Sequence, residues 1–133
     1  MDQEAEKLVQ ERIAKNRFAN LIGMKLVKVE TGYAVTMIPI TADMWNPYNA
    51  VHGGVLFTAA DVAGGAAAAS YGRKVVTLDA DFHYLEAGMN CRYIQATARE
   101  VRCGHHVMVF RLDVTDDVNN HLAEGTFTYM AID

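Results

Sequence analysis

Apolar residues recur at helical intervals near the start of the chain. Between residues 2 and 16, Ala5, Val9 and Ile13 stand four positions apart among charged residues, with Leu8 beside them. This spacing places the apolar side chains on one face of an amphipathic helix. We therefore predict an outer helix over residues 2–16 that packs by this face against the rest of the domain.

Residues 53–71 (GGVLFTAADVAGGAAAASY) have small or apolar side chains around the whole circumference of a helix, and Asp61 is their only charged residue. Such a pattern is typical of a helix that is buried on all sides. Gly64 and Gly65 lie inside it, and each glycine lowers helix stability by up to about 1 kcal/mol relative to alanine. We predict that a neighbouring element, a curved sheet, approaches the helix backbone at these two glycines.

Six other runs have the residue types and alternation of β-strands; they span residues 25–30, 33–40, 74–85, 92–101, 106–116 and 122–132. The first two flank a hairpin turn at Thr31–Gly32, and turn residues separate the last four. No helix-length segments remain for parallel crossovers among these four strands, so we predict that they pair as an antiparallel meander. The expected fold is α+β, with one antiparallel sheet wrapped around a long central helix and an extra N-terminal helix.

Composition supports one domain over residues 1–133. The chain is 51% hydrophobic and 21% charged, and a second full domain does not fit into this length. Its formal net charge of −4 excludes a general cationic surface for nucleic acid. The N-terminus lacks the features of a signal peptide, and charges at Asp61, Arg73 and Lys74 interrupt the most apolar region. We therefore expect a cytoplasmic protein without a membrane span.

Two cysteines, Cys91 and Cys103, are expected to stay reduced in that compartment. Cys103 precedes His105 and His106 closely, but zinc sites take paired ligands from two segments of the chain. We expect no bound metal.

Asp61 is the residue whose placement most needs a chemical reason. Its neighbours three and four positions away on the helix are Phe57, Thr58, Gly64 and Gly65, so no local Lys or Arg can pair with its charge. Burying an isolated carboxylate among apolar groups is unfavourable. We interpret Asp61 as a general base or nucleophile; the alternative is that it faces solvent on an exposed stripe.

His52, Gly53 and Gly54 stand where the central helix begins. The first N–H groups of a helix have no partner within it and lie at the positive end of its dipole, so they can polarise a carbonyl or stabilise an oxyanion. Glycine lets a substrate approach these groups closely. A tight loop-to-helix turn without catalytic function would use the same residues.

Eight residues separate Gly53 from Asp61, which is about 12 Å along a helix. This separation is too large for both groups to act on one carbonyl carbon. If both are catalytic, one must come from a second chain, and a twofold axis would then create two composite sites. The sequence therefore predicts a homodimer.

These motifs resemble a known family. The run NPYNAVHGG from Asn46 to Gly54, then Asp61 in an alanine-rich helix, then TLDADF from Thr77, is similar to the hotdog-fold acyl-CoA thioesterases of the phenylacetate-degradation and 4-hydroxybenzoyl-CoA type. The likeness extends from about Leu21 to the C-terminus.

The resemblance implies a role for each matching residue. The Gly53 N–H would bind the thioester carbonyl, and Asn46 and His52 would help to hold the substrate and the active-site loop. Asp61 would activate water or attack directly, and the hydroxyl of Thr77, from the same chain, would orient the water. The family dimer places the acid across the interface from the glycine turn, in agreement with the distance argument.

Two positions depart from the family pattern. Asn49 stands where the family usually has glycine, although asparagine is the residue that best tolerates a positive φ after glycine. Glu86 stands in a run, LEAG, where relatives often have leucine, arginine and proline. A basic residue that could face the CoA phosphates is thereby absent.

One further strand pattern concerns residues 78–83, in which Asp79, Asp81 and His83 alternate with apolar residues. This alternation predicts a polar face and an apolar face rather than a second acidic site. Two loop aromatics, Trp45 and Tyr48, either line an acyl pocket or pack on the domain.

The sequence thus favours a thioester hydrolase acting on acyl-CoA or aryl-acyl-CoA, with no separate cofactor because coenzyme A is part of the substrate. The expected assembly is a homodimer, with a homotetramer formed as a dimer of dimers left open. Two alternatives remain: a hydroxyacyl dehydratase on the same fold, and a non-catalytic acyl-CoA-binding protein.

Overall fold

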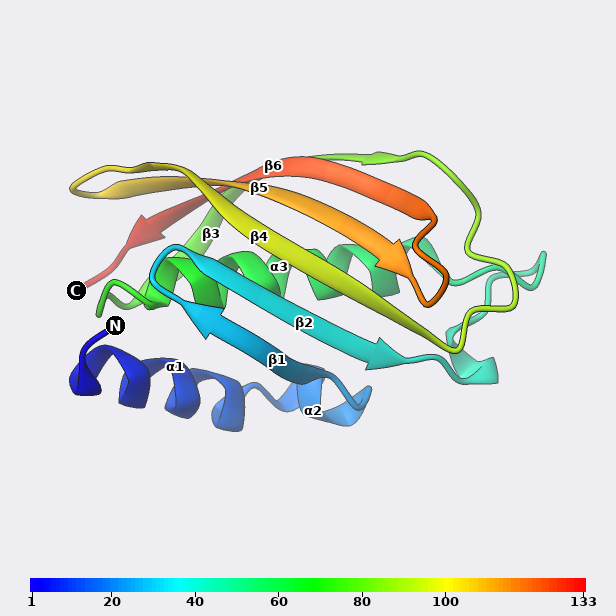
Figure 1. Cartoon of the computed structure of the whole chain (residues 1–133), viewed down its shortest axis with the longest axis horizontal. Coiled ribbons are helices and arrows are strands. Elements are labelled where there is room, and N and C mark those ends of the chain that lie inside the picture. Colours follow the sequence, from blue (N-terminus) through cyan, green and yellow to red (C-terminus); the bar gives the residue numbers. More distant parts are fainter.

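The computed structural model describes residues 1–133. Its elements are α1 (Gln3–Lys15), α2 (Arg17–Leu21), β1 (Lys25–Glu30), β2 (Tyr33–Pro39), a short 3-10 helix (Ala42–Met44), α3 (Gly53–Ala69), β3 (Val75–Tyr84), β4 (Tyr93–Cys103), β5 (Val107–Asp116) and β6 (His121–Ala131). The six strands form one antiparallel sheet that curves over α3, with α1 and α2 below (Figure 1). The predicted α+β fold and its helices and strands are confirmed; α2 is an additional short helix.

The order of strands corrects the predicted meander. The sheet runs β1-β2-β4-β5-β6-β3, so only β4, β5 and β6 form a meander. β2 pairs with β4, whereas β3 pairs with β6 at the opposite edge. The reason is α3, which lies between β2 and β3 in the sequence. This helix carries the chain across the concave face of the sheet. Consecutive strands on either side of this helix therefore end at different places in the sheet.

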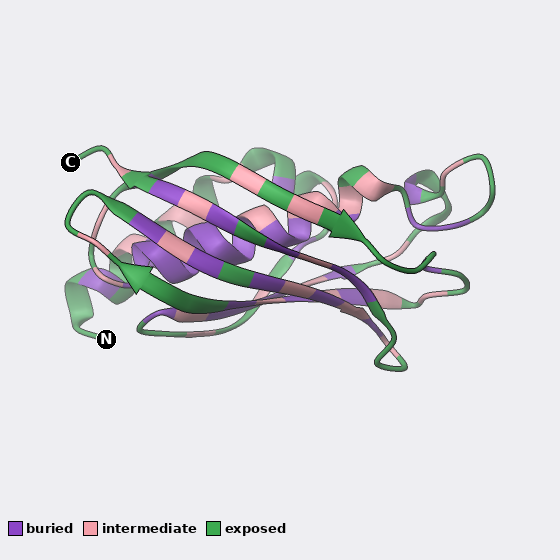
Figure 2. Ribbon diagram, turned by 90° about the horizontal axis from the view of Figure 1, so that it is seen from above, coloured by how far each residue is buried: buried purple, intermediate pink, exposed green.

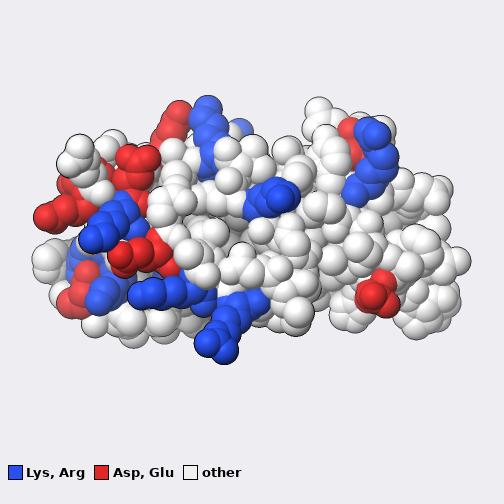
Figure 3. Space-filling view, turned by 90° about the horizontal axis from the view of Figure 1, so that it is seen from below, with Lys and Arg blue, Asp and Glu red and all other residues white.

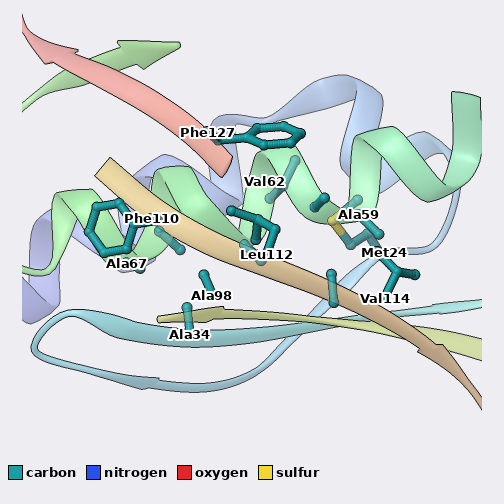
Figure 4. Close-up of a cluster of buried hydrophobic side chains, with 14 of the residues drawn as sticks. Met24, Ala34, Ala59, Val62, Ala67, Ala98, Phe110, Leu112, Val114 and Phe127 are labelled. Atoms are coloured by element: carbon teal, nitrogen blue, oxygen red, sulfur yellow. The ribbon is translucent and has the colours of Figure 1, made fainter. Parts of the chain in front are cut away.

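The core forms between α3 and the sheet, because both surfaces carry small side chains where they meet. Ala59 through Ala69 on α3 are almost all buried (Figure 2). Alanines on β2 and β4 lie on the opposite side of the contact, and Phe110 and Leu112 of β5 pack over the helix (Figure 4). This close packing confirms the prediction that α3 is the buried central helix.

Gly64 and Gly65 are contacted by different elements. A Cβ atom on Gly64 would overlap the hydroxyl of Tyr129 on β6, which confirms the predicted approach of the sheet. At Gly65 the prediction is wrong: the neighbour is the guanidinium of Arg12 on α1, whose Nη2 would lie 2.6 Å from an added Cβ. The N-terminal helix therefore reaches the middle of α3 through one long side chain.

A β-bulge in β3 decides which of its side chains face α3. Thr77 pairs with Tyr129 on β6 and Asp79 with Thr128, so Leu78 is the extra residue. The bulge reverses the alternation of side chains along β3. The odd-numbered Thr77 faces α3 before the bulge, whereas even-numbered residues face α3 after the bulge. The predicted polar and apolar faces are confirmed for residues 79–83. Leu78, which the alternation placed on the apolar face, is exposed.

None of the helices combines the length and the apolar character that crossing a bilayer requires.

Candidate active site

Asp61 lies in the middle of α3 and is held by two hydroxyl groups of the sheet. Thr77 on β3 donates a hydrogen bond of 2.6 Å from Oγ1 to Oδ1 of Asp61. The backbone carbonyl of Asp61 accepts a second one, 2.8 Å long, from the hydroxyl of Tyr129 on β6. No Lys or Arg forms a salt bridge with Asp61. The half-buried carboxylate therefore keeps Oδ2 available for another partner.

At the N-terminus of α3, the hydrogen bonds of His52 leave one backbone donor free. Nδ1 of His52 accepts the N–H of Gly54 at 2.9 Å, and the N–H of His52 donates to the carbonyl of Met44 at 2.7 Å. The N–H of Gly53 has no acceptor within the chain. Because it lies at the positive end of a 17-residue helix, it is suited to bind a carbonyl oxygen.

The loop before α3 is organised by Asn46. Its Oδ1 accepts the backbone N–H groups of Tyr48 at 2.9 Å and Ala50 at 3.1 Å. Asn49, inside this turn, has a φ of 64°, the left-handed conformation expected of a residue that replaces glycine there. The carboxamide of Asn46 thus holds the loop in the shape that positions the start of α3.

A cavity of about 340 Å³ opens beside this helix start, and Asn46, Gly53, Tyr84 and Glu86 are among its lining residues. Tyr84 donates a hydrogen bond of 3.0 Å to the carbonyl of Gly53, and burial raises the pKa of the Tyr84 hydroxyl. Its ring would lie 3.1 Å from a Cβ on Gly53, so a larger residue there would require the ring to move by a few tenths of an ångström.

The structure brings the predicted site residues together in two separate groups. Asn46 and Gly53 share the cavity at the start of α3, and His52, on the neighbouring surface, lines a different one. Asp61 and Thr77 are joined to each other but line neither cavity.

A model of the thioesterase superfamily matches residues 48–123, which is more than half of the chain. The chain belongs to the thioesterase superfamily.

Individual relatives have similar lengths and folds. The acyl-coenzyme A thioesterase PaaI of Escherichia coli is 28% identical over 105 residues, covering 79% of this chain and 75% of the relative. The 1,4-dihydroxy-2-naphthoyl-CoA hydrolase of Listeria monocytogenes is 29% identical over 104 residues, covering 76% and 84%. The structure of E. coli PaaI superposes with a TM-score of 0.92 at 24% identity, covering 98% of this chain and 94% of that one. These matches confirm the hotdog fold and the resemblance stated above.

Sequence reasoning missed three residues of this thioesterase that lie around the site: Arg12, Tyr84 and Tyr129. Tyr84 and Tyr129 lie within predicted strands, but the face on which each ring lies depends on strand register. Arg12 is one of several charged residues on an amphipathic helix, and nothing in the local pattern distinguishes it. None of the three has a sequence signal that would have found it.

The charges of this thioesterase are unevenly distributed. Viewed from below, Lys, Arg, Asp and Glu gather at the end where α1 lies, and the end with the loop before α3 carries few (Figure 3). Three arginines already have partners within the chain: Arg73 pairs with Asp133, Arg92 with Asp117, and Arg99 lies over the Tyr33 ring. Trp45 and Tyr48 line neither cavity at the start of α3 and are 49% and 81% exposed.

Two clusters have the residue types of metal ligands, and both differ from the Cys103 region considered above: Cys91 with Asp116 and Asp117, and Asp113 with His121 and Glu124. Asp116 accepts the N–H groups of Val118 and Asn120, so its carboxylate holds a turn. In the other cluster both acids form salt bridges with Arg111, whose guanidinium lies 3.1 Å from each. Each carboxylate cluster therefore has a structural explanation.

Proposed function

We propose that this thioesterase hydrolyses acyl-CoA or aryl-acyl-CoA thioesters, using Asp61 and Thr77 to deliver water and the Gly53 N–H to bind the carbonyl. The observation that carries the proposal is the hydrogen bond between Thr77 and Asp61, because it leaves one oxygen of a half-buried carboxylate free in an otherwise apolar helix. The activities of the E. coli and L. monocytogenes relatives support a CoA thioester as the substrate class.

The proposed reaction starts with the thioester oxygen accepting a hydrogen bond from Gly53. Asp61 Oδ2 accepts a proton from a water molecule, whose oxygen attacks the carbonyl carbon. The hydroxyl of Thr77 donates to Asp61, so its lone pairs can accept a hydrogen bond from the same water and orient it. The tetrahedral oxyanion is stabilised by the N–H and the helix dipole, and its collapse expels the CoA thiolate, which takes up a proton. Direct attack by Asp61 on the carbonyl carbon is the alternative first step.

We further propose that each active site combines Asp61 and Thr77 of one protomer with Asn46, His52 and Gly53 of its partner. The separate placement of the two groups within one chain supports this composite site. The position of β3 supports it as well: this strand is a sheet edge beside Thr77, and Val76 and Leu78 are 43% and 55% exposed there. An unpaired apolar edge is suited to pair with a second copy of the chain. A dimer of dimers stays a prediction.

The hydrogen bonds of His52 bear on the dehydratase alternative. A hydroxyacyl dehydratase on this fold pairs a histidine with an acid, but Nδ1 of His52 already accepts the N–H of Gly54.

The charge of Glu86 bears on where coenzyme A binds. Glu86 lines the cavity at Gly53, so its negative charge opposes phosphate binding there and favours a CoA nucleotide bound farther out.

Release of free thiol from a panel of acyl-CoA and aryl-CoA thioesters tests the activity. We expect turnover by the wild type, loss of turnover in Asp61→Asn, and normal turnover in Asp79→Asn, an exposed acid on the same strand as Thr77. Circular dichroism should show the same fold for all three. Binding without turnover by the folded wild type would favour the non-catalytic reading, and an active Asp61→Asn variant would remove Asp61 from the mechanism.

A further inference from the structure

Helix α1 contributes a charged side chain to the region around Asp61, although it lies outside residues 48–123 that match the family model. Ala5 and Val9 of α1 are buried, and Arg12 follows Val9 by one turn toward α3. Arg12 is half-buried. A half-buried guanidinium loses hydration, so its position calls for compensating contacts.

The contacts of Arg12 join α3 to β3. Nη1 donates a hydrogen bond of 2.9 Å to the carbonyl of Val75, two residues before Thr77. The guanidinium also lies against the backbone of Gly65, with Nη2 2.6 Å from the place of an added Cβ. Arg12 therefore connects the same helix and strand that the hydrogen bond between Thr77 and Asp61 connects.

Asp61 is also among the groups whose electrostatic interaction acts on Arg12. Burial lowers the pKa of the guanidinium, while the interactions with Tyr129 and Asp61 oppose this effect. The other groups around Asp61 are the hydroxyls of Thr77 on β3 and Tyr129 on β6. Burial and the nearby Asp61 raise the pKa of Tyr129 well above its ordinary value, so this hydroxyl is neutral. Neither hydroxyl supplies a positive charge.

We propose that Arg12 is a positioning residue for hydrolysis, which aligns α3 with β3 and thereby keeps the Thr77 hydroxyl against the Asp61 carboxylate. This inference rests on the proposed function of Asp61. Arg12 touches neither the substrate nor the reacting atoms; it acts through Asp61 and through the strand that carries Thr77.

The test compares Arg12→Met and Arg12→Lys with Lys15→Met. Lys15 lines the same groove between α1 and β3 but is exposed, so it controls for the loss of one positive charge from this helix. We expect Arg12→Met to lower kcat by about tenfold with little change in KM. Arg12→Lys should restore only part of kcat, since an ammonium lacks the planar guanidinium fork that contacts both α3 and β3.

Gly65→Ala supplies a second, independent perturbation. Its Cβ displaces the guanidinium, so we expect it to lower kcat in the wild type but not further in Arg12→Met. Additive effects of the two substitutions would contradict the proposal. Wild-type kcat in a folded Arg12→Met, beside an inactive Asp61→Asn, would overturn this inference alone. If Arg12→Met does not fold, Arg12→Lys and Gly65→Ala decide: a lower kcat at unchanged KM in both supports the inference, and wild-type kcat in both overturns it. Lack of turnover by the wild type would instead overturn the proposed function, and this inference with it.

Discussion

The hydroxyl of Thr77 donates a hydrogen bond of 2.6 Å to the carboxylate of Asp61, and so connects the edge strand of the sheet to the middle of the central helix. A bulge at Leu78 follows this contact. Thr77 precedes the bulge and faces α3, whereas Asp79 follows it and is exposed. The bulge therefore turns the next carboxylate of the strand, Asp79, away from the helix that carries Asp61.

Removing the Thr77 hydroxyl should have a smaller effect than removing the Asp61 carboxylate. We expect Thr77→Ala to lower kcat by tenfold to a hundredfold, on the order of what one orienting hydroxyl contributes. Thr77→Ser keeps the hydroxyl and should stay close to wild type. A loss in Thr77→Ala as large as in Asp61→Asn would give Thr77 a different role.

Mixed dimers test the composite site. Asp61→Asn chains and Asn46→Ala chains, each inactive or weak alone, are mixed under conditions that let subunits exchange. Random mixing makes about half of the dimers mixed, and each mixed dimer then has one intact site and one site with both lesions. The mixture should therefore recover to about a quarter of wild-type activity.

If both groups act within one chain, every site in the mixture keeps a lesion and activity stays at the level of the parents. Exchange itself is verified by mass spectrometry of differently labelled chains. Verified exchange without recovery would rule out the composite site.

Gly64→Ala tests the contact between α3 and β6. The new Cβ overlaps the hydroxyl of Tyr129, whose side chain is fully buried and cannot move aside. Overpacking of this kind costs about 1–3 kcal/mol, which exceeds the gain in helix propensity of up to about 1 kcal/mol. We expect a lower free energy of unfolding in urea, and partial recovery when Tyr129→Phe removes the overlapping oxygen. Unchanged stability of Gly64→Ala would show that this contact is loose.

Cys91 should react slowly with alkylating agents. Burial, with the charges of Asp116 and Asp117, raises the pKa of its thiol from 9.0 to about 11. In a Cys103→Ser background the alkylation rate should therefore increase with pH up to about 11, instead of levelling near 9 as in the unfolded chain. The fold favours the protonated thiol, so the stability contributed by this group is complete below pH 9 and decreases as pH rises toward 11. A plateau at pH 9 in the folded protein would contradict the shift.

The sequence by itself was enough to locate nearly all helices and strands, because each carries a local pattern. The period of Ala5, Val9 and Ile13 marks α1, and the small residues around Asp61 mark a buried helix. The family resemblance and the residue type together indicated that Asn49 could adopt a positive φ, and its φ of 64° confirms this. Asp61 and Gly53 were selected for the site by chemistry that depends only on neighbours along the helix.

Other features were decided only by tertiary structure, because they depend on residues far apart in the chain. The predicted meander was wrong since α3 carries the chain to the far edge of the sheet before β3 begins. With strict alternation along β3, Thr77 and Phe82 would lie on opposite faces of the strand. The bulge between them places both side chains on the face toward α3. Arg12 lies 63 residues from Val75 and reaches it only because α1 packs on α3. Local patterns determine which residues form helices and strands, whereas the packing of those elements determines which side chains meet at Asp61.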